Sequence, residues 1–300
     1  MSTSRVLTAV DADYPALLAA TSSPPPLWVS GTLLDSDGLA IAIVGARRAT
    51  PYGVEIAERL AADLAARGAT IVSGLARGID TAAHRGALAA GGRTIAVLGT
   101  GIDGRYPPEN RALADEIEAH GALVSQFSPG MPAYAGNFPM RNRTIAGLAL
   151  GIVVVEAGER SGALITAGAA ADFGREVFAV PGRITSEMAR GPHGLLRDGA
   201  TLVRSWMDIV QELPSSWRSV VSDAAIVIDA AAPHAPTTDE SAVLATLTAD
   251  EPQQIEHVIA HCGLAPSRVG ATLVSLELAG HVRQLEGQRW VAVRARPRRA

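Results

Sequence analysis

Short apolar runs alternate with helical stretches between positions 39 and 213, and this alternation limits the fold more than any other feature of the chain. The run at 39–44 is apolar throughout, as expected for a strand buried on both faces of a sheet. Repeated strand–helix units predict an α/β fold with a doubly wound, mostly parallel sheet, which binds ligands at the carboxyl ends of its strands. Six further strands are predicted at 70–73, 94–98, 122–125, 151–155, 176–180 and 201–203.

The chain is predicted to have five parts. They are a short N-terminal segment, the α/β domain, a linker, a winged-helix domain and a basic disordered tail, at 1–38, 39–213, 214–236, 237–293 and 294–300 respectively. The first part is irregular, although Trp28 and Val29 are predicted to form one extended piece that packs on the α/β domain. Three helices followed by a hairpin around Glu286-Gly287-Gln288 predict the winged helix-turn-helix.

The composition excludes several classes of protein. Cys262 is the only cysteine in 300 residues, which excludes an internal disulfide and a cysteine-based metal cluster. No run approaches the roughly 18 apolar residues of a membrane span, and the first residues lack the apolar core of a signal peptide. We therefore expect a cytoplasmic protein with no membrane segment. The net charge of −4 means that the chain as a whole does not attract polyanions.

Arginines fall in the loops that follow the predicted strands. Arg47 lies between the strand 39–44 and a helix that begins at Pro51, and Arg77 lies in a glycine-rich turn after the strand 70–73. The chain contains no lysine, so all 26 of its cations are arginines, whose planar guanidinium suits phosphate. Because the carboxyl ends of parallel strands meet at one edge, these arginines predict an anion site there.

A further pair of arginines precedes the strand 151–155. A loop that ends at Pro139 is followed by a helix predicted to carry Arg141, Asn142 and Arg143 in its first turn. Arginines at a helix start oppose the macrodipole unless an anion lies there. His193 and Arg197 approach from a later loop. Since the α/β domain holds 17 arginines against 17 acidic residues, the predicted phosphate pocket is local.

The motifs with possible catalytic chemistry are each interpreted as structural. The Gly-x-Gly-x-x-Gly at 99–104 follows a strand but opens no helix, so we predict a tight loop and no dinucleotide. Asp80 and His84 lie four residues apart on one helix, and a capping aspartate beside a packed histidine is favoured over a metal or acid–base pair. Glu156 has no second carboxylate at a useful spacing. We predict no catalytic residue, no metal and no cofactor.

Five segments resemble bacterial DNA-processing protein A, the DprA or Smf family of natural transformation, and they occur in the family's order. They are Gly45-Ala46-Arg47 with Pro51-Tyr52-Gly53, Ser73-Gly74-Leu75-Ala76-Arg77-Gly78-Ile79-Asp80, Tyr106-Pro107-Pro108-Glu109-Asn110, Asn137-Phe138-Pro139-Met140-Arg141-Asn142-Arg143, and Ser161-Gly162-Ala163-Leu164-Ile165-Thr166-Ala167. The resemblance is dense from about Tyr14 to Leu213 and looser in the winged helix.

The resemblance implies an extended Rossmann fold that binds single-stranded DNA, loads RecA on it, acts as a homodimer and is not an enzyme. Carried over by position, the implied DNA-binding residues are Arg47, Arg77, Asn137, Phe138, Arg141, Asn142, Arg143, Ser161, Gly162 and His193. Phe138 is either a stacking partner for a base or a buried loop anchor. Departures from the family at Ala46, Met140 and His193-Gly194 put individual contacts in question.

Two other functions remain as alternatives. One is a nucleotide phosphoribohydrolase resembling the Lonely Guy proteins, although their Pro-Gly-Gly-x-Gly-Thr segment is replaced here by Glu159-Arg160-Ser161-Gly162-Ala163. The other is a regulator that binds DNA through the winged helix. That domain holds three arginines against seven acidic residues, so it is a poor nonspecific DNA binder and protein contact is an equally good role.

Overall fold

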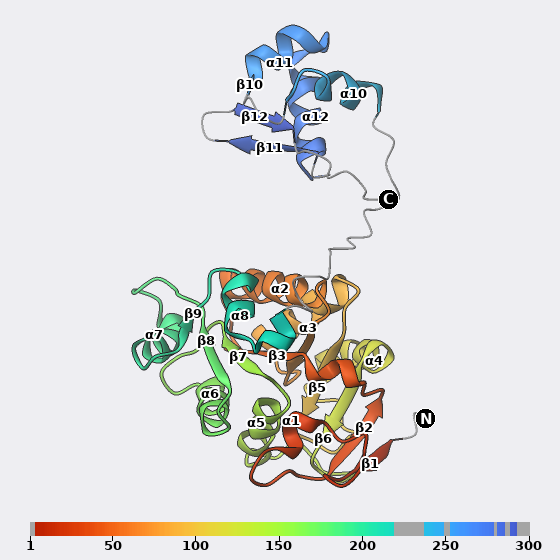
Figure 1. Cartoon of the computed structure of the whole chain (residues 1–300), viewed down its shortest axis with the longest axis vertical. Coiled ribbons are helices and arrows are strands. Elements are labelled where there is room, and N and C mark those ends of the chain that lie inside the picture. Colours follow the sequence, from red (N-terminus) through yellow and green to blue (C-terminus); the bar gives the residue numbers. More distant parts are fainter. Residues whose placement is uncertain (1–3, 219–236, 249–252, 279–280, 286–288, 293–300) are drawn as a thin grey trace. The chain divides into compact units, whose positions relative to one another are not determined.

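The computed structural model describes residues 4–218, 237–248, 253–278, 281–285 and 289–292. The chain forms two compact units, Met1–Ile228 and Asp229–Ala300 (Figure 1). The predicted basic tail and most of the predicted linker lie outside the described residues. Residues 215–218 of that linker are helical, and Trp217 packs on the core of the first unit.

A nine-stranded sheet, in the order β1-β2-β6-β5-β4-β3-β7-β8-β9, forms the centre of the first unit. The strands from β6 to β9 are parallel, and β2 joins β6 in the antiparallel sense. The strand bounds are β1 Arg5–Leu7, β2 Leu27–Gly31, β3 Ala40–Val44, β4 Thr70–Ser73, β5 Thr94–Leu98, β6 Ala122–Ser125, β7 Gly151–Val154, β8 Glu176–Ala179 and β9 Thr201–Leu202. The prediction of a doubly wound, mostly parallel sheet is confirmed.

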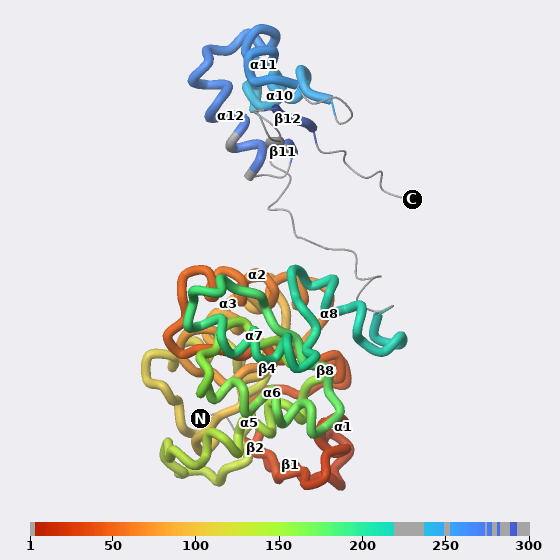
Figure 2. The backbone as a smooth tube through the Cα atoms, turned by 90° about the vertical axis from the view of Figure 1, so that its left-hand side faces the viewer, coloured from red at the N-terminus to blue at the C-terminus, as the bar shows by residue number. Residues whose placement is uncertain are grey.

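Helices cover both faces of this sheet, because its central strands have apolar residues on both faces. Ala40, Ala42 and Val44 pack towards one core, and Ile41 and Ile43 towards the other. Figure 1 and the turned view in Figure 2 show α2, α3 and α8 on one face and α1, α5 and α6 on the other. The helix bounds are α1 Ala16–Ala19, α2 Pro51–Ala65, α3 Ile79–Ala89, α4 Arg111–His120, α5 Asn137–Gly147, α6 Gly162–Asp172, α7 Arg190–Arg197 and α8 Trp206–Glu212, with short 3-10 turns η1 Asp35–Gly38, η2 Pro108–Asn110 and η3 Glu187–Ala189.

The strand order reverses between β3 and β7. From β3 the chain first adds β4, β5 and β6 on one side, and then crosses to add β7, β8 and β9 on the other. In open α/β sheets the loops at such a switch point diverge and leave a crevice outside the carboxyl ends of the strands. The loops after β3 and β7 are therefore the first place to look for a ligand site.

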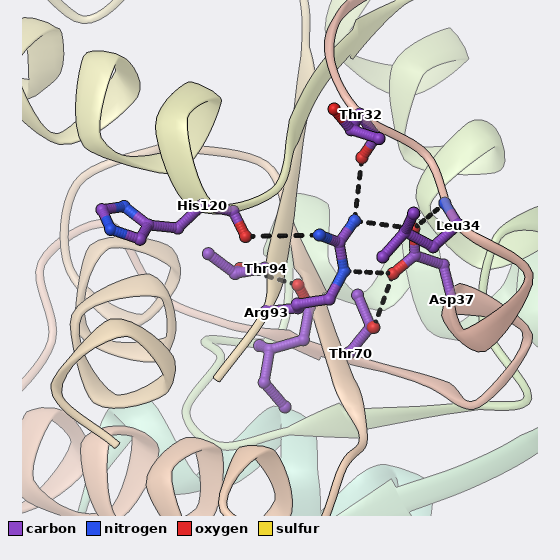
Figure 3. Close-up of polar contacts among 8 residues, drawn as sticks. Thr32, Leu34, Asp37, Thr70, Arg93, Thr94 and His120 are labelled. Carbon is purple, nitrogen blue, oxygen red and sulfur yellow. Dashed lines mark hydrogen bonds and ion pairs between the residues drawn. The ribbon is translucent and has the colours of Figure 1, made fainter. Parts of the chain in front are cut away.

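The prediction of an extended piece at Trp28 and Val29 is confirmed, because both residues lie in β2, which joins the main sheet. The rest of the N-terminal segment is more regular than predicted, since β1 pairs with β2. Figure 3 shows the hydrogen bonds by which Arg93, just before β5, joins this segment to the amino ends of the parallel strands. Its guanidinium donates to both oxygens of Asp37 at 2.9 and 3.0 Å and to the Thr32 carbonyl at 2.8 Å. Asp37 also accepts from the Thr70 hydroxyl at 2.8 Å, so η1 is joined to β4.

The second unit has the winged-helix elements that the sequence predicts. They are α10 Thr238–Leu244, β10 Gln253–Gln254, α11 Ile255–Cys262, α12 Pro266–Leu278, β11 Val282–Leu285 and β12 Arg289–Ala292. Thr237 and Glu240 form a reciprocal capping box at the start of α10. Val269, Leu273 and Leu276 are fully buried, as predicted, and Cys262 packs at the edge of that core. Among the helices of the described parts, none is long and apolar enough to cross a membrane.

Candidate functional site

A pocket of about 210 Å³ opens at the carboxyl edge of the sheet, where the strand order reverses. Four segments line it: the loop after β3, the turn before α3, the first half of α5 and the start of α6. The lining residues from the predicted set are Arg47, Phe138, Arg141, Asn142, Ser161 and Gly162. A smaller cavity adjoins it, shares Arg47, Phe138 and Arg141, and adds Arg77 and Tyr106.

Arg141 is buried beneath the pocket. The prediction that it lies in the first turn of its helix is wrong. The helix α5 begins at Asn137, before Pro139, so Arg141 falls in the second turn. It is 4% exposed and donates to the carbonyls of Gly74 at 2.5 Å and Val97 at 2.6 Å. Burial lowers the pKa of Arg141 to about 10, so the side chain remains charged at neutral pH.

Gly74 provides the room for this guanidinium. A Cβ at Gly74 would lie 2.6 Å from the Cζ of Arg141. Gly78 has a different role, because its φ of +73° and its close approach to the Ala46 carbonyl turn the chain into α3. These glycines explain why the segment 73–80 brings its backbone so close to the loop after β3.

Arg47 is the exposed cation of the pocket. It lies in the loop after β3, and its guanidinium stands 5.2 Å from the centre of the Phe138 ring. Arg47 makes no ion pair with a described residue. Phe138 is half-buried, packs 6.0 Å from the Tyr106 ring and also lies 5.7 Å from the Arg141 guanidinium. One aromatic ring therefore lies within 6 Å of two guanidiniums, the exposed Arg47 and the buried Arg141.

The start of α6 forms the opposite wall. Ser161 is its N-cap, as predicted, and accepts from the Ala163 amide at 3.3 Å. Asn142 links the two walls, because its amide donates to the Gly162 carbonyl at 3.0 Å while its oxygen accepts from Arg141 at 3.1 Å. Asn137 is buried and donates to the Gly99 carbonyl at 3.2 Å, so it holds a loop in place and does not face the pocket.

Besides Asn137, three residues of the predicted set lie outside the pocket. Arg77 borders the smaller cavity and forms an ion pair with Glu109. Arg143 points away from Arg141, stacks 4.9 Å from the Phe173 ring and lies 3.4 Å from Asp172. His193 donates from Nε2 to the Gly182 carbonyl at 3.0 Å and lines a separate hollow with Arg197. The pocket therefore brings together Arg47 and Arg141 but neither Arg143 nor His193.

The titratable groups near the pocket are engaged in hydrogen bonds that hold the surrounding loops and strands. Glu156 accepts from both the hydroxyl and the amide of Thr50, at 2.6 and 2.8 Å, and so organises the loop that Arg47 occupies. His84 is fully buried, bonds to Thr94 at 2.7 Å, and has its pKa lowered to about 3, first by burial and then by Arg141. Burial raises the pKa of Asp80, while Arg141 opposes the shift.

These groups do not form an acid–base pair, because the ring of His84 bonds to Thr94 and Asp80 accepts from the Ala76 amide at 3.3 Å. The interpretations of Glu156 as a loop organiser and of His84 as a packed histidine are confirmed. The Gly-x-Gly-x-x-Gly at 99–104 is also the predicted loop, in which the Gly101 amide donates to the Met131 carbonyl at 2.8 Å. Sequence reasoning missed Thr50 and Tyr106, whose contacts come from distant segments.

The fold and the pocket define a class of α/β proteins that combine a Rossmann-like domain, with arginines at its switch point, and a winged helix. The family model for DNA recombination-mediator protein A matches residues 5–214, and that for the DprA winged helix domain matches residues 229–288. The chain therefore belongs to the DNA processing protein A (DprA/Smf) family.

Individual relatives agree with this assignment. Protein Smf of Escherichia coli is 39% identical over 280 residues, which cover 91% of this chain and 73% of that protein. The DNA processing protein DprA of Bacillus subtilis is 44% identical over 203 residues, or 67% and 68% of the two chains. Two solved structures are also similar in fold.

The X-ray structure of DprA from Streptococcus pneumoniae has a TM-score of 0.67 and 42% identity, over 70% of this chain and 74% of that one. A structure of the Helicobacter pylori protein, described for its single-stranded DNA binding mode, has a TM-score of 0.62 and 28% identity over 70% and 97% of the two chains. The prediction of the family is confirmed.

Proposed function

We propose that this protein binds single-stranded DNA without breaking bonds in it, at the arginine pocket on the carboxyl edge of its parallel sheet. The observation that carries the proposal is the position of Arg47, an exposed guanidinium without an ion pair among the described residues, beside the half-exposed Phe138 ring. Phosphate contacts from arginine and base stacking on an aromatic ring are the two parts of sequence-tolerant single-strand binding.

The parts of the pocket have different roles in this proposal. Arg47 contacts a backbone phosphate, and Phe138 stacks on a base. Arg141 lies beneath them and contributes positive potential and the position of the loops, while the exposed backbone at Gly162 gives the strand room at the start of α6. The single-stranded DNA binding mode described for the Helicobacter pylori relative supports single-stranded DNA as the ligand.

Membership of the family supports a wider role. We propose that the protein acts as a homodimer that protects incoming single strands and loads RecA on them during natural transformation. The absence of a paired acid and base among the described pocket residues supports a role in holding DNA. The Lonely Guy reaction is disfavoured because Glu156 is engaged with Thr50 at the base of the loop.

The test is binding of a fluorescent oligonucleotide, measured by anisotropy, to the parent and to Arg47→Ala. We expect a loss of roughly 10- to 100-fold in affinity, because one charge-assisted contact contributes about 1.5–3 kcal/mol. Arg85→Ala, an exposed arginine on α3, is the control and is expected to bind like the parent. Equal affinities for the parent and Arg47→Ala would place the site elsewhere.

A further inference from the structure

A second pocket of about 550 Å³ lies beside the first on the same edge of the sheet. It is formed where β7 and β8 end, and its lining includes Thr50, Tyr52, Glu156, Arg183 and Ser186. The loop between β3 and α2 contributes Arg47 to the first pocket and Thr50 to the second, so the two pockets share one loop. Its volume is in the range that encloses a molecule of nucleotide size.

We propose that this second pocket binds a further nucleotide of the same DNA strand, with its base on the Tyr52 ring and its phosphate at Arg183. This inference rests on the proposed single-stranded DNA binding and extends it from one pocket to a track over the β3–α2 loop.

Tyr52 has the properties of a stacking platform. It is 48% exposed in the first turn of α2, and its hydroxyl donates to the Pro181 carbonyl at 3.3 Å. That contact fixes the far end of the side chain on the loop after β8, while much of the side chain stays accessible. A flat aromatic surface accepts any base, because every base has a π-face.

Arg183 supplies the cation. It is exposed on the loop between β8 and α7, and it makes no ion pair or side-chain hydrogen bond with a described residue. Glu156, by contrast, is 5% exposed on the pocket wall, and its carboxylate repels a phosphate placed there. The phosphate is therefore expected at Arg183, and the base is expected inside.

Glu156 also favours a base over an apolar occupant. Each of its oxygens accepts one hydrogen bond from Thr50 and keeps a second lone pair. The exocyclic amines of adenine, cytosine and guanine, and the ring N–H of thymine, can all donate to it. The pocket is thus expected to prefer a base of any kind to an apolar occupant.

The experiment measures affinity as a function of oligonucleotide length, over the roughly 4–16 nucleotides that single-strand sites cover. Arg183→Ala is expected to weaken the binding of long oligonucleotides about tenfold, by one charged contact, and to leave the shortest ones that still bind the parent unchanged. Arg59→Ala, an exposed arginine on α2, is the matched control and should not change either. Tyr52→Phe should bind like the parent, and Tyr52→Ala should follow Arg183→Ala.

The outcomes separate this inference from the proposed function. If Arg183→Ala binds long oligonucleotides as tightly as the parent while Arg47→Ala does not, the second pocket is overturned and the first stands. If the parent binds no oligonucleotide, both are overturned. A free nucleotide is the other possible source of this ligand, and deoxyadenosine monophosphate is its probe. Direct binding of this mononucleotide that Arg183→Ala abolishes, with no change in oligonucleotide affinity, would identify a free-nucleotide site and contradict a DNA track.

Discussion

Arg93 and Arg141 are both held by backbone carbonyls at opposite ends of the same parallel strands, but only one of them is neutralised. Arg93, at the amino ends, meets the carboxylate of Asp37 with two hydrogen bonds (Figure 3). Arg141, at the carboxyl ends, meets carbonyls and the Asn142 oxygen, and no carboxylate of the described residues lies within ion-pair distance of it. The first arginine joins parts of the chain, whereas the second keeps its charge beneath a pocket.

The partner of an arginine, more than its burial, indicates its role. A bidentate carboxylate completes the hydrogen-bonding capacity and the charge of a guanidinium together. Carbonyls complete only the hydrogen bonds of Arg141. The nearby Asp80 opposes its positive field without forming an ion pair, and Arg47 adds to that field. At the carboxyl ends, two pocket arginines, Arg47 and Arg141, thus have no ion pair among the described residues.

Breaking the Arg93 contact is expected to have the largest effect on stability. Arg93→Ala leaves Asp37, whose side chain is 9% exposed, without its cation, and the expected loss in the free energy of unfolding is about 3 kcal/mol. Urea unfolding measures it. Arg5→Ala, which removes the exposed pair with Asp13, is the control and should cost at most about 1 kcal/mol. A loss of DNA affinity by folded Arg93→Ala would contradict the division between the two ends.

Gly74→Ala tests whether the position of the Arg141 guanidinium matters. The new Cβ would lie 2.6 Å from the Arg141 Cζ, so we expect a loss of about 2 kcal/mol in stability from overpacking and weaker DNA binding. Thermal unfolding and anisotropy give the two values. Gly168→Ala, in α6, meets nothing within 4 Å and should be stabilising or neutral. Parent-like binding by Gly74→Ala would show that the position of Arg141 does not matter.

His84 reports on the same buried region through pH. Its pKa is about 3 in the folded state and near 6.5 in the unfolded state, so the unfolded state binds more protons below pH 6.5. Stability is therefore lost as pH falls from 6.5 towards 3, by about 2 kcal/mol between pH 6.5 and pH 5. Urea unfolding at pH 7.5 and pH 5 should show this loss reduced in His84→Gln. Asp80, whose shift is opposite, is present in both proteins, and an equal pH dependence of the two would refute the prediction.

The smallest effect is expected at the edge of the site, where Glu109 neutralises Arg77. Both side chains are about half exposed or more, so the pair is weak and a phosphate can compete for the guanidinium. Glu109→Gln should tighten DNA binding by about twofold, since one repulsive charge is removed at an exposed position. Glu116→Gln, also exposed on α4, should change affinity less. Weaker binding by Glu109→Gln would mean that the pair itself supports the site.

The central strands were predicted well because each is a short apolar run with a clear end. The strands at 70–73, 94–98 and 122–125 have the predicted bounds, because each is an apolar run ended by glycine, arginine or a turn. The antiparallel β1 escaped prediction because it is a short run among polar residues, whereas β2 contains the extended piece predicted at Trp28 and Val29. The start of α5 was misplaced because Pro139 was interpreted as the end of a loop, although proline is tolerated in the first helical turn.

The prediction of the site succeeded for residues placed by the ends of strands. It failed for residues whose side-chain direction decides their place. Arg47 and Ser161 follow directly from the carboxyl ends of β3 and β7. Arg141 and Arg143 are two residues apart, which places them about 200° apart around a helix, so the sequence itself argued against one shared face. The ion pair of Arg77 with Glu109 joins segments 32 residues apart and has no local signal.

The salt dependence of single-stranded DNA binding tests the central claim most directly. For single strands, the slope of log K against log salt has a magnitude of about 0.7 per neutralised phosphate. We predict that Arg47→Ala reduces this magnitude by about 0.7 relative to the parent, while Arg85→Ala leaves it unchanged. An unchanged slope in Arg47→Ala would contradict a phosphate contact at this arginine and with it the assignment of the carboxyl edge as the DNA site.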